Sequence, residues 1–462
     1  MSNTAPGPDK FRYNDLKRID PGCLTLSTIY TRCLRTRKIP KGWKESETIL
    51  LHKGGPVGDI SNWRPLAMGN CVAKLYAAVL ADRITVWARR EHQLSPEQKG
   101  FLTDEGCLEE NFLLQSAIDD CRRSNKQLCV GWLDLTNAFG SVPHRHIFNT
   151  LERMGLPTGI INVIKDLYEE AGTRVRTING HTDRIHLSNG VKQGCPLSPI
   201  VFNLAMEPLL RTIRAKRDMT SYKLVGGMKL QMMVYADDIC VTASTPDALQ
   251  ETLSIAGKAA KECGLTFKPS KCATLHMNCQ KGRRVEPSVF SIQGGSPKVL
   301  KEGEAYRHLG IPTGYRVAQT PTEAINQMID DLNAIDESAL APWQKIDAVA
   351  TFINPRIEFI ARGGFVFKTL LYPIDKLTKK LAKRWLHLPQ RASAEVVYLL
   401  PSQGGAGLLP LADGIDIATV TQAYRMLTSR DVGGKTPDPH LPSGKTEKTL
   451  EVQDLQYHRR WD

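Results

Sequence analysis

The amino-acid sequence predicts a fold of the α+β class, in which a strand-containing middle part is joined to helical parts on either side. Short apolar runs that suit buried strands alternate with helical patterns between about residues 128 and 275. Apolar residues recur at helical spacing before this part and again past about residue 317. The chain of 462 residues is also long enough for about two to four domains around a substantial core.

The first part of the chain is expected to be mainly helical. A Pro/Gly-rich start leads into a helix within residues 1–45, whose apolar stripe would hold Leu24, Ile29, Tyr30 and Leu34. A short strand at 47–52 follows and ends in a glycine-rich turn. Helical spacing of apolar residues predicts two more helices, one within 63–92 and one through residues 108–118.

The middle part contains the clearest strands. Residues 128–135 form a short apolar run bounded by polar residues, which predicts a buried strand. Residues 230–243 are typical of a strand, a tight turn and a second strand. Thr245 then suits the N-cap of a helix with Pro246 at its first position, and Gly264 would end that helix.

The last part is expected to be helical again. Residues 320–323 match a capping box ahead of one helix, and a later helix places Ile374, Leu377, Leu381 and Trp385 on one face. The rest of that later helix is basic, which favours either a solvated charged face or a nucleic-acid contact; its basic residues are Lys376, Lys379, Lys380, Lys383 and Arg384. Residues 431–448 are poor in large apolar side chains and are expected to be disordered.

Composition limits the classes of protein that fit. The 61 Lys and Arg against 48 Asp and Glu leave a net charge of +13, which favours a polyanionic partner but is also compatible with a merely basic surface. The eleven cysteines are scattered without zinc spacing, and Cys71, Cys129, Cys195 and Cys240 lie in apolar runs that suit buried thiols. We therefore expect a reducing, intracellular protein without a zinc site. Neither a signal peptide nor a bilayer-length apolar run is found, so neither secretion nor membrane insertion is expected.

Two adjacent acids interrupt the apolar run 233–241. Asp237 and Asp238 stand where a hairpin turn is expected, and burying unpaired carboxylates is costly, so a bound cation explains them, although turns also favour Asp on their own account. Asp134, at the end of the apolar run 128–133, supplies a third carboxylate from another strand. Such oxygen ligands suit Mg²⁺, and two ions about 3.5–4 Å apart can assist phosphoryl transfer.

The sequence resembles the reverse transcriptase of non-LTR retrotransposons, and it is most similar in appearance to the class that inserts at defined sites in ribosomal DNA. The resemblance covers about residues 5–430 and rests on seven blocks in the family's order: Asn62-Trp63-Arg64-Pro65-Leu66 with Lys74 and Arg83, Gln98-Lys99-Gly100-Phe101, Leu133-Asp134-Leu135-Thr136-Asn137-Ala138-Phe139, the loop 190–199 with its Gln193-Gly194-Cys195-Pro196 string, Tyr235-Ala236-Asp237-Asp238, Gly264-Leu265-Thr266-Phe267 with Lys271, and Tyr306-Arg307-His308-Leu309-Gly310.

The resemblance implies a catalytic set. Asp134 and Asp237 would be the principal metal ligands, with Asp238 a nearby acid of smaller direct involvement. The ions would be two Mg²⁺, with Mn²⁺ as a substitute. Lys271 would lie near the departing pyrophosphate as a charge stabiliser or proton donor, although a lone Lys is ordinarily a surface residue.

The resemblance also implies nucleotide contacts. Leu135 and Phe139 would lie near the incoming nucleotide, with Phe139 under the sugar, where it would exclude a 2′-hydroxyl; core packing is the alternative for this ring. Gln193 and Gly194 would face the nucleotide, unless their string is only a turn into the next helix.

Two further sets of contacts follow from the family pattern. Arg64 and Lys74 would hold the triphosphate, since a guanidinium can grip phosphate with two hydrogen bonds. Residues 306–310, with Tyr306, Leu309 and Gly310, would grip the primer end.

The fold implied by the resemblance is a right-hand polymerase with an antiparallel-sheet palm backed by helices, mixed fingers and a helical thumb. Fingers would span 1–127, the palm 128–316 with an inserted fingers segment at about 140–190, the thumb 317–430, and a flexible tail 431–462. The partners would be an RNA template, a DNA primer and deoxynucleoside triphosphates, and no membrane. An enzyme from a retrotransposon would work in the nucleus.

Two departures from the family pattern stand out. Gly140 stands where many relatives have a second Asp after the Ala-Phe pair, which puts the local loop geometry in doubt. The chain also matches the polymerase portion alone, with no endonuclease region, zinc knuckle or DNA-binding finger in its sequence. Two alternatives stay open: a reverse transcriptase of the group II intron type, and an inactive or domesticated remnant that binds nucleic acid without polymerising.

Overall fold

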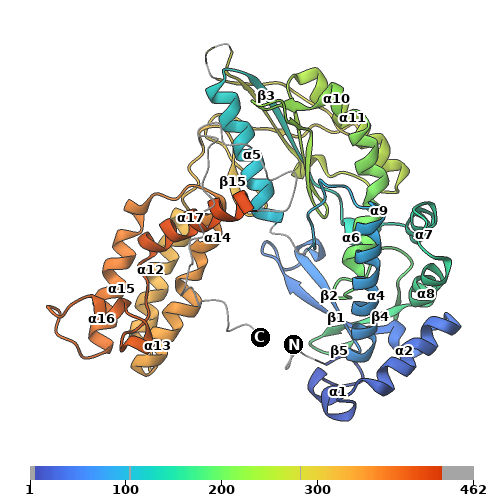
Figure 1. Cartoon of the computed structure of the whole chain (residues 1–462), viewed down its shortest axis with the longest axis horizontal. Helices are drawn as coiled ribbons and strands as arrows, with labels where there is room; N and C mark the ends of the chain where they lie inside the picture. The colour runs from blue at the N-terminus through green and yellow to red at the C-terminus, as the bar shows by residue number, and fades with distance from the viewer. Residues whose placement is uncertain (1–5, 103–105, 281, 283, 429–462) are drawn as a thin grey trace, which may run out of the picture.

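The computed structural model describes residues 6–102, 106–280, 282 and 284–428, and its middle part is a six-stranded sheet (Figure 1). The strands are antiparallel to their neighbours, except that the last of them runs parallel to β11. The order is β12 (Arg284–Glu286), β11 (Ala273–Asn278), β3 (Gln127–Leu133), β10 (Asp238–Ala243) and β9 (Met232–Tyr235), with β13 (Lys298–Val299) beside β11. The strand predicted near 128–135 and the strand-turn-strand predicted within 230–243 are both confirmed.

Helices cover both faces of this sheet, which explains why β3 is apolar throughout. Leu128, Val130 and Trp132 pack on one face with α5 (Gly106–Arg123). Cys129 and Leu133 belong to the core on the other face, which is covered by α9 (Ser198–Arg214) and α11 (Pro246–Glu262). A strand buried on both sides has no solvent face on which polar residues could alternate.

The ends of α11 are those that the sequence predicts. The Thr245 hydroxyl accepts a hydrogen bond from the Ala248 N–H at 3.3 Å, and Pro246 is the first helical residue. Gly264 follows the C-cap with a φ of +74°, a conformation that glycine adopts without steric cost.

A second sheet lies beside the N-terminal helices, and it contains a strand that was not predicted. The helix expected within 63–92 is α4 (Cys71–Arg90), but residues 63–69 before it form strand β2 (Trp63–Gly69), antiparallel to β1 (Glu45–His52). Pro65 has no N–H, and β2 is an edge strand, where a missing donor is tolerated. On its other side β1 pairs with a strand from much later in the chain, β4 (Gly172–Thr177). The short strands β5 (Gly180–His181) and β6 (Ile185–His186) pair in turn with β4.

Short helices complete the N-terminal side of the molecule. Helix α2 (Leu24–Thr36) is present as predicted, but its stripe is shifted, because Leu26 and Cys33 are buried whereas Leu24 is 76% exposed. The other elements here and at the sheet edge are α1 (Tyr13–Ile19), α3 (Lys41–Lys44), α6 (Ala138–Ser141), α7 (His144–Arg153), α8 (Thr158–Tyr168), α10 (Arg217–Thr220), β7 (Tyr222–Lys223) and β8 (Lys229–Leu230).

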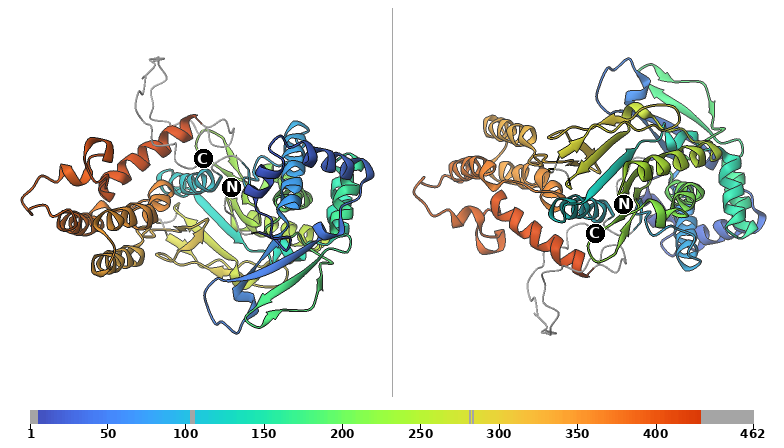
Figure 2. Two further views of the ribbon diagram at one scale, coloured as in Figure 1. Left: turned by 90° about the horizontal axis from the view of Figure 1, so that it is seen from below. Right: turned by 90° about the horizontal axis from the view of Figure 1, so that it is seen from above.

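The C-terminal part is helical, has its own apolar core, and lies on the side of the central sheet opposite the N-terminal helices (Figures 1 and 2). The capping box expected at 320–323 is wrong, since the Thr320 hydroxyl accepts from the Phe367 N–H at 3.0 Å instead of capping the helix. The helices are α12 (Thr322–Glu337), α13 (Pro342–Ala348), α14 (Pro355–Gly363), α15 (Tyr372–Trp385), α16 (Glu395–Tyr398) and α17 (Leu411–Thr428). The stretch 431–448 lies outside the described residues.

All eleven cysteines are free thiols. Cys71, Cys129 and Cys240 are buried as predicted, whereas Cys195 is only partly buried. Within the described part of the chain, none of the helices has both the length and the apolar character needed to span a bilayer.

We predict that truncating Leu332 on α12 destabilises the helical part. The Leu332 side chain is fully buried, so Leu332→Ala should lower the local free energy of unfolding by about 2–5 kcal/mol through lost transfer energy and a cavity. Leu427→Ala is the matched control, because Leu427 on α17 is 61% exposed and should change that free energy by less than about 0.5 kcal/mol. Hydrogen exchange of the helical part measures both, and equal effects of the two variants would contradict this view of its core.

Candidate active site

Strand register brings the three predicted acids to one edge of the central sheet. Ile239 on β10 pairs with Leu133 on β3. Because the two strands are antiparallel, the residue before Ile239, Asp238, lies opposite the residue after Leu133, Asp134. Asp238 also pairs with Tyr235 and closes the hairpin, which leaves Asp237 in the turn. An antiparallel register therefore gathers residues that are about a hundred positions apart in the chain.

Electrostatics show that these carboxylates act on one another. Burial raises the pKa of all three carboxyls, and the charge of Asp134 raises that of Asp237 further. Although Asp238 keeps contact with solvent, burial and the charges of Asp237 and Asp134 raise its pKa to about 6. Nearby cations oppose this, since Lys271 and Lys268 lower the pKa of Asp134. The raised carboxyl pKa values mark a site where a bound cation would stabilise the charged form of the carboxylates.

The donor set suits a hard cation whose coordination is completed from outside the protein. In the ranges that the structure describes, no three His, Cys, Asp or Glu residues converge closely enough to enclose an ion. Mg²⁺ ordinarily uses one or two carboxylates together with water and phosphate oxygens, so Asp134 and Asp237 are a sufficient protein contribution. His144 and His146 are used within the protein, since the Nε2 of each contacts a backbone carbonyl at 2.9 Å, that of Gly190 and that of Ala205 respectively.

A loop after α11 brings Lys271 to the acids. The Lys268 N–H donates to the Asp134 carbonyl at 2.8 Å, and the next residues form the short turn 269–271 that ends at Lys271. Leu135 bridges to Phe267 in the same place, and its side chain is only 5% exposed. The Leu135 side chain fills the core, so only its backbone remains for the predicted nucleotide contact, which stays a prediction.

Phe139 lies in an aromatic group beside the acids. Its ring stacks on Phe202 of α9, with centroids 4.1 Å apart and an angle of 14° between the planes. Phe101 meets it edge-on at 5.8 Å, and Phe101 also lies 6.2 Å from Tyr235 of the turn. Phe139 keeps partial exposure, so it is at once a packing residue and a surface beside the acids. A contact with sugar remains a prediction.

The loop after Gly190 is joined to strand β2. The Ala67 N–H donates to the Gln193 carbonyl at 2.7 Å. Gly194 has a φ of +103°, and a Cβ there would lie 2.7 Å from the Ala67 carbonyl oxygen. Glycine is therefore needed for this approach of loop to strand. The Gln193 carbonyl is used within the protein, which leaves the partly exposed Gln193 side chain for a ligand.

Gly140, which departs from the family pattern, lies in close contact with a second glycine. A Cβ on Gly140 would meet the Asn137 side chain at 2.5 Å, and a Cβ on Gly190 would lie 2.6 Å from the Gly140 Cα. The two glycines pack directly against each other, and the Val191 N–H donates to the Phe139 carbonyl at 2.7 Å. The loop that bears Phe139 is therefore packed and hydrogen-bonded against the Gly190 loop, and no acid at position 140 is needed for this.

Arg64 and Lys74 differ in their relation to the acids. Arg64 on β2 is exposed, and its charge lowers the pKa of Asp237. Lys74 on α4 acts instead on Asp9 and Cys71, whose pKa values it lowers. The structure therefore brings Arg64, but not Lys74, under the electrostatic influence of the acidic cluster.

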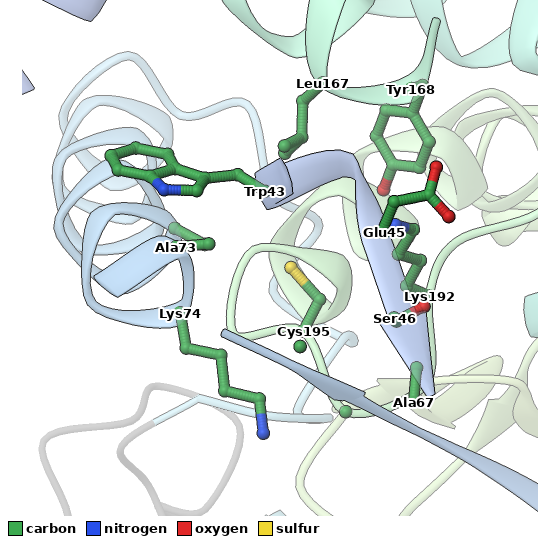
Figure 3. Close-up of a pocket in the computed structure, with 13 residues that line it drawn as sticks. Trp43, Glu45, Ser46, Ala67, Ala73, Lys74, Leu167, Tyr168, Lys192 and Cys195 are labelled. Atoms are coloured by element: carbon green, nitrogen blue, oxygen red, sulfur yellow. The ribbon is translucent and has the colours of Figure 1, made fainter. Parts of the chain in front are cut away.

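Lys74 lies at the edge of a pocket behind the Gly190 loop (Figure 3). Gly194 and Cys195 line this pocket, and the Trp43 ring lies across from Cys195. Lys192 extends along another wall, where its ammonium donates to the Lys44 carbonyl at 2.5 Å, and burial lowers its pKa. This buried ammonium fastens the loop to the segment before β1.

The segment expected to grip the primer also reaches the acids. It forms the hairpin of β14 (Tyr306–His308) and β15 (Ile311–Thr313), with Leu309 and Gly310 in the turn at positive φ. The Tyr306 ring stacks on Trp132 of β3 at 5.1 Å. Burial raises the Tyr306 pKa, and the charges of Asp238 and Asp134 raise it further.

The basic helix face predicted for nucleic acid is only partly available. Lys376 and Lys380 on α15 are exposed. Lys383 is a correction, because it is 6% exposed and its ammonium donates to the carbonyls of Gln390 and Ala392. Arg384 is paired with Asp336. Hydrogen bonds and an ion pair within the protein occupy the basic side chains in the last turn of α15. The exposed lysines lie nearer the start of the helix.

One contact at the site was missed from the sequence. Gln98 was recognised only as part of a family block, without a role, yet its side chain bonds to the backbone of Ala236 in the acidic turn. The two residues are 138 positions apart, and no periodicity or spacing rule links them. Phe202, the stacking partner of Phe139, lies inside an apolar helix and was missed for the same reason.

Comparisons with known proteins show the family of the chain. The family model for reverse transcriptase (RNA-dependent DNA polymerase) matches residues 51–323. The retrovirus-related Pol polyprotein from type-1 retrotransposable element R2 of Nasonia vitripennis is 28% identical over 410 residues, covering 88% of this chain and 38% of that protein. The polyprotein from type-2 retrotransposable element R2DM of Drosophila melanogaster is 27% identical over 412 residues, with the same two coverages. The chain thus spans about two fifths of the length of these relatives.

A solved structure of apo telomerase from Candida tropicalis aligns with a TM-score of 0.38 at 12% identity, covering 57% of this chain and 59% of that one. The sequence relatives confirm the predicted resemblance to non-LTR reverse transcriptases of the R2, ribosomal-DNA-specific class. All seven blocks and all three acids lie within the matched range 51–323, which is more than half of the chain. The chain belongs to the reverse transcriptase (RNA-dependent DNA polymerase) family.

Proposed function

We propose that this chain extends a primer 3′-end with deoxynucleotides on an RNA template, as the polymerase portion of a non-LTR retrotransposon protein. The observation that carries the proposal is the gathering of Asp134, Asp237 and Asp238 at one sheet edge, with raised carboxyl pKa values. Lys271 and Arg64 act electrostatically on this cluster. The names of the relatives, Pol polyproteins of R2 elements, support the same assignment.

We further propose a right-hand arrangement of the three parts. Residues 1–127 would be the fingers, 128–316 the palm with an insert at about 140–190, and 317–430 the thumb. The pairing of β4 and β6 with one another and of β4 with β1 supports the insert, because it joins residues 172–186 to the N-terminal sheet. The separate core of the C-terminal helices supports the thumb.

The reaction would depend on charge and position more than on covalent chemistry. Two Mg²⁺ ions, with Mn²⁺ as a substitute, would supply activation of the 3′-hydroxyl and stabilisation of the departing pyrophosphate. Asp134 and Asp237 would hold them through carboxylate oxygens, and Asp238 would add negative charge beside them. Lys271 Nζ would stabilise, or protonate, the departing pyrophosphate.

The other residues would orient the nucleotide and the primer. Arg64 can grip a triphosphate with two parallel hydrogen bonds from its guanidinium. Phe139, stacked on Phe202, would lie under the sugar and exclude a 2′-hydroxyl. Gly194 would permit close approach beside Gln193, and the turn at Leu309 and Gly310 would hold the primer end. Such an enzyme would act on a DNA primer and an RNA template in the nucleus.

We predict that Asp237→Ala removes primer extension. Purified protein with Mg²⁺, a primed RNA template and deoxynucleotides should extend the primer, and the variant should lose at least about a hundredfold, because second-sphere changes at metal sites already cost about 10–100-fold. Asp183→Ala, at an exposed position outside the acidic cluster, is the control and should retain activity. Undiminished extension by Asp237→Ala would refute the mechanism, whereas an inactive wild type would favour the nucleic-acid-binding remnant.

We predict that Asp238→Asn stabilises the metal-free protein at pH 7.5 but not at pH 4. The pKa of Asp238 in the folded protein is about 6, above the ordinary value of 3.8. The wild type therefore loses folding free energy as the pH rises from 3.8 to 6, and the loss is complete above pH 6. Because solvent screens this site, we expect a gain of only about 1 kcal/mol, or about 1–3 °C in Tm. Thermal unfolding in EDTA measures it. Added Mg²⁺ should stabilise the wild type more than the variant, and a gain that persists at pH 4 would contradict this account.

We predict that Lys376→Gln with Lys380→Gln weakens binding of a primed template and lowers its salt dependence. Each lost phosphate contact should reduce the slope of log K against log salt by about 1. Lys258→Gln with Lys261→Gln is the matched control, since these lysines are also exposed and one turn apart, but on α11. Fluorescence anisotropy across a salt series measures both, and equal slopes for the two double variants would exclude α15 from the interface.

A further inference from the structure

The turn that bears the acids contains a strained residue. Ala236 is the first of the two residues between the paired Tyr235 and Asp238, and its φ is +59°. Two-residue hairpin turns with positive φ at this place favour glycine, because a Cβ is disfavoured there. Ala236 is also 2% exposed, so its backbone groups cannot be satisfied by bulk water.

One side chain holds both backbone groups of Ala236. Gln98 Oε1 accepts from the Ala236 N–H at 2.8 Å, and Gln98 Nε2 donates to the Ala236 carbonyl at 3.2 Å. The same Oε1 accepts from the Gly100 N–H at 2.8 Å. Gln98 is itself 1% exposed, so its amide is enclosed with the turn. A planar amide bonded at both ends opposes rotation of the peptides on either side of Ala236.

The segment that bears Gln98 is fixed in turn to the sheet. Its backbone pairs with β9, where the Lys99 N–H donates to the Val234 carbonyl at 2.8 Å and the Val234 N–H donates to the Glu97 carbonyl at 3.1 Å. Gly100 packs so closely that a Cβ there would lie 2.3 Å from the Ala236 nitrogen. The position of Gln98 is therefore set independently of the turn that it holds.

Helix α9 secures this segment at both ends. Asn203 Nδ2 donates to the Gly100 carbonyl at 2.7 Å. The Glu207 carboxylate accepts from the N–H and the hydroxyl of Ser95, both at 2.7 Å. Phe202, which stacks on Phe139, belongs to the same helix. One helix thus fixes both the support of the acidic turn and the ring beside it.

We propose that Gln98 is a positioning residue that sets the direction of the Asp237 and Asp238 carboxylates by locking Ala236 at positive φ; this rests on the proposed function. Asp237 follows Ala236 directly, so a rotation at Ala236 moves its carboxylate relative to Asp134. Displacements of about 1 Å are enough to cost reactivity when ligands must converge. Gln98 contacts the turn backbone and acts through it.

The test compares two buried glutamines that lie next to the β9–β10 hairpin. Gln98→Met keeps length and volume but cannot hydrogen-bond. Gln231→Met is the matched control: Gln231 is 4% exposed, immediately precedes β9, and donates to the Ile213 carbonyl and the Thr220 hydroxyl, away from the turn. Both variants should lower the Tm to a similar extent, because each removes bonds from buried groups.

Only Gln98→Met should weaken metal binding. Electron paramagnetic resonance would follow a Mn²⁺ titration of protein bound to a chain-terminated primed RNA template with the incoming nucleotide. We expect the apparent Mn²⁺ affinity of Gln98→Met to fall about 10–100-fold, as for other groups that orient metal ligands. The affinity of Gln231→Met should stay within about twofold of wild type. Affinity for the primed template, measured by anisotropy, should be unchanged in both.

A second substitution separates positioning from general destabilisation. Ala236→Gly in the Gln98→Met background should restore part of the Mn²⁺ affinity, because glycine adopts positive φ without the hydrogen bonds from Gln98. Equal Mn²⁺ affinity of Gln98→Met and Gln231→Met would overturn the proposal, as would the absence of any rescue by Ala236→Gly. Failure of the proposed function is a different result, since an active Asp237→Ala would reveal it without involving Gln98.

Discussion

Like charges held together at the edge of a sheet are the constraint on which the rest of this structure depends. Pairing of Ile239 with Leu133 places Asp238 beside Asp134; burial raises the pKa of both carboxyls, and the charges of Asp237 and Asp134 raise that of Asp238 further. Such a cluster costs free energy, so its surroundings must hold it in place. Helices on both faces of the sheet, the tie of Lys268 to the Asp134 carbonyl and the cations nearby all serve this end.

The site is assembled from segments that are far apart in the chain and rigid in themselves. The turn at Leu309 and Gly310, the loop at Gly194 and the strand with Arg64 each belong to a different element, yet each is fastened to a neighbour. Tyr306 stacks on Trp132 of the strand that leads to Asp134, and Gln193 bonds to Ala67 on the strand of Arg64. The relative placement of charge and aromatic surface thus follows from backbone pairing more than from flexible side chains.

The sequence alone could predict those features that break a local rule. Asp134, Asp237 and Asp238 stand out because acids interrupt apolar strands, and Thr245 and Gly264 because they cap a helix. Strand β2 was missed because tertiary pairing with β1 overrides the local pattern around Pro65. The burial of Lys383 and the contact of Gln98 with Ala236 were missed because each depends on partners that only the fold brings near.

The order of pairing in the N-terminal sheet has a consequence for synthesis. Strand β1 pairs with β2 as soon as residue 69 exists, but its parallel neighbour β4 ends only at residue 177. At about 5–20 residues per second, a ribosome leaves one edge of β1 open for several seconds or more. An open edge is a template for pairing with other chains. The arrangement that brings the loop of Gly194 to its strand therefore makes the nascent chain dependent, for that interval, on protection from aggregation.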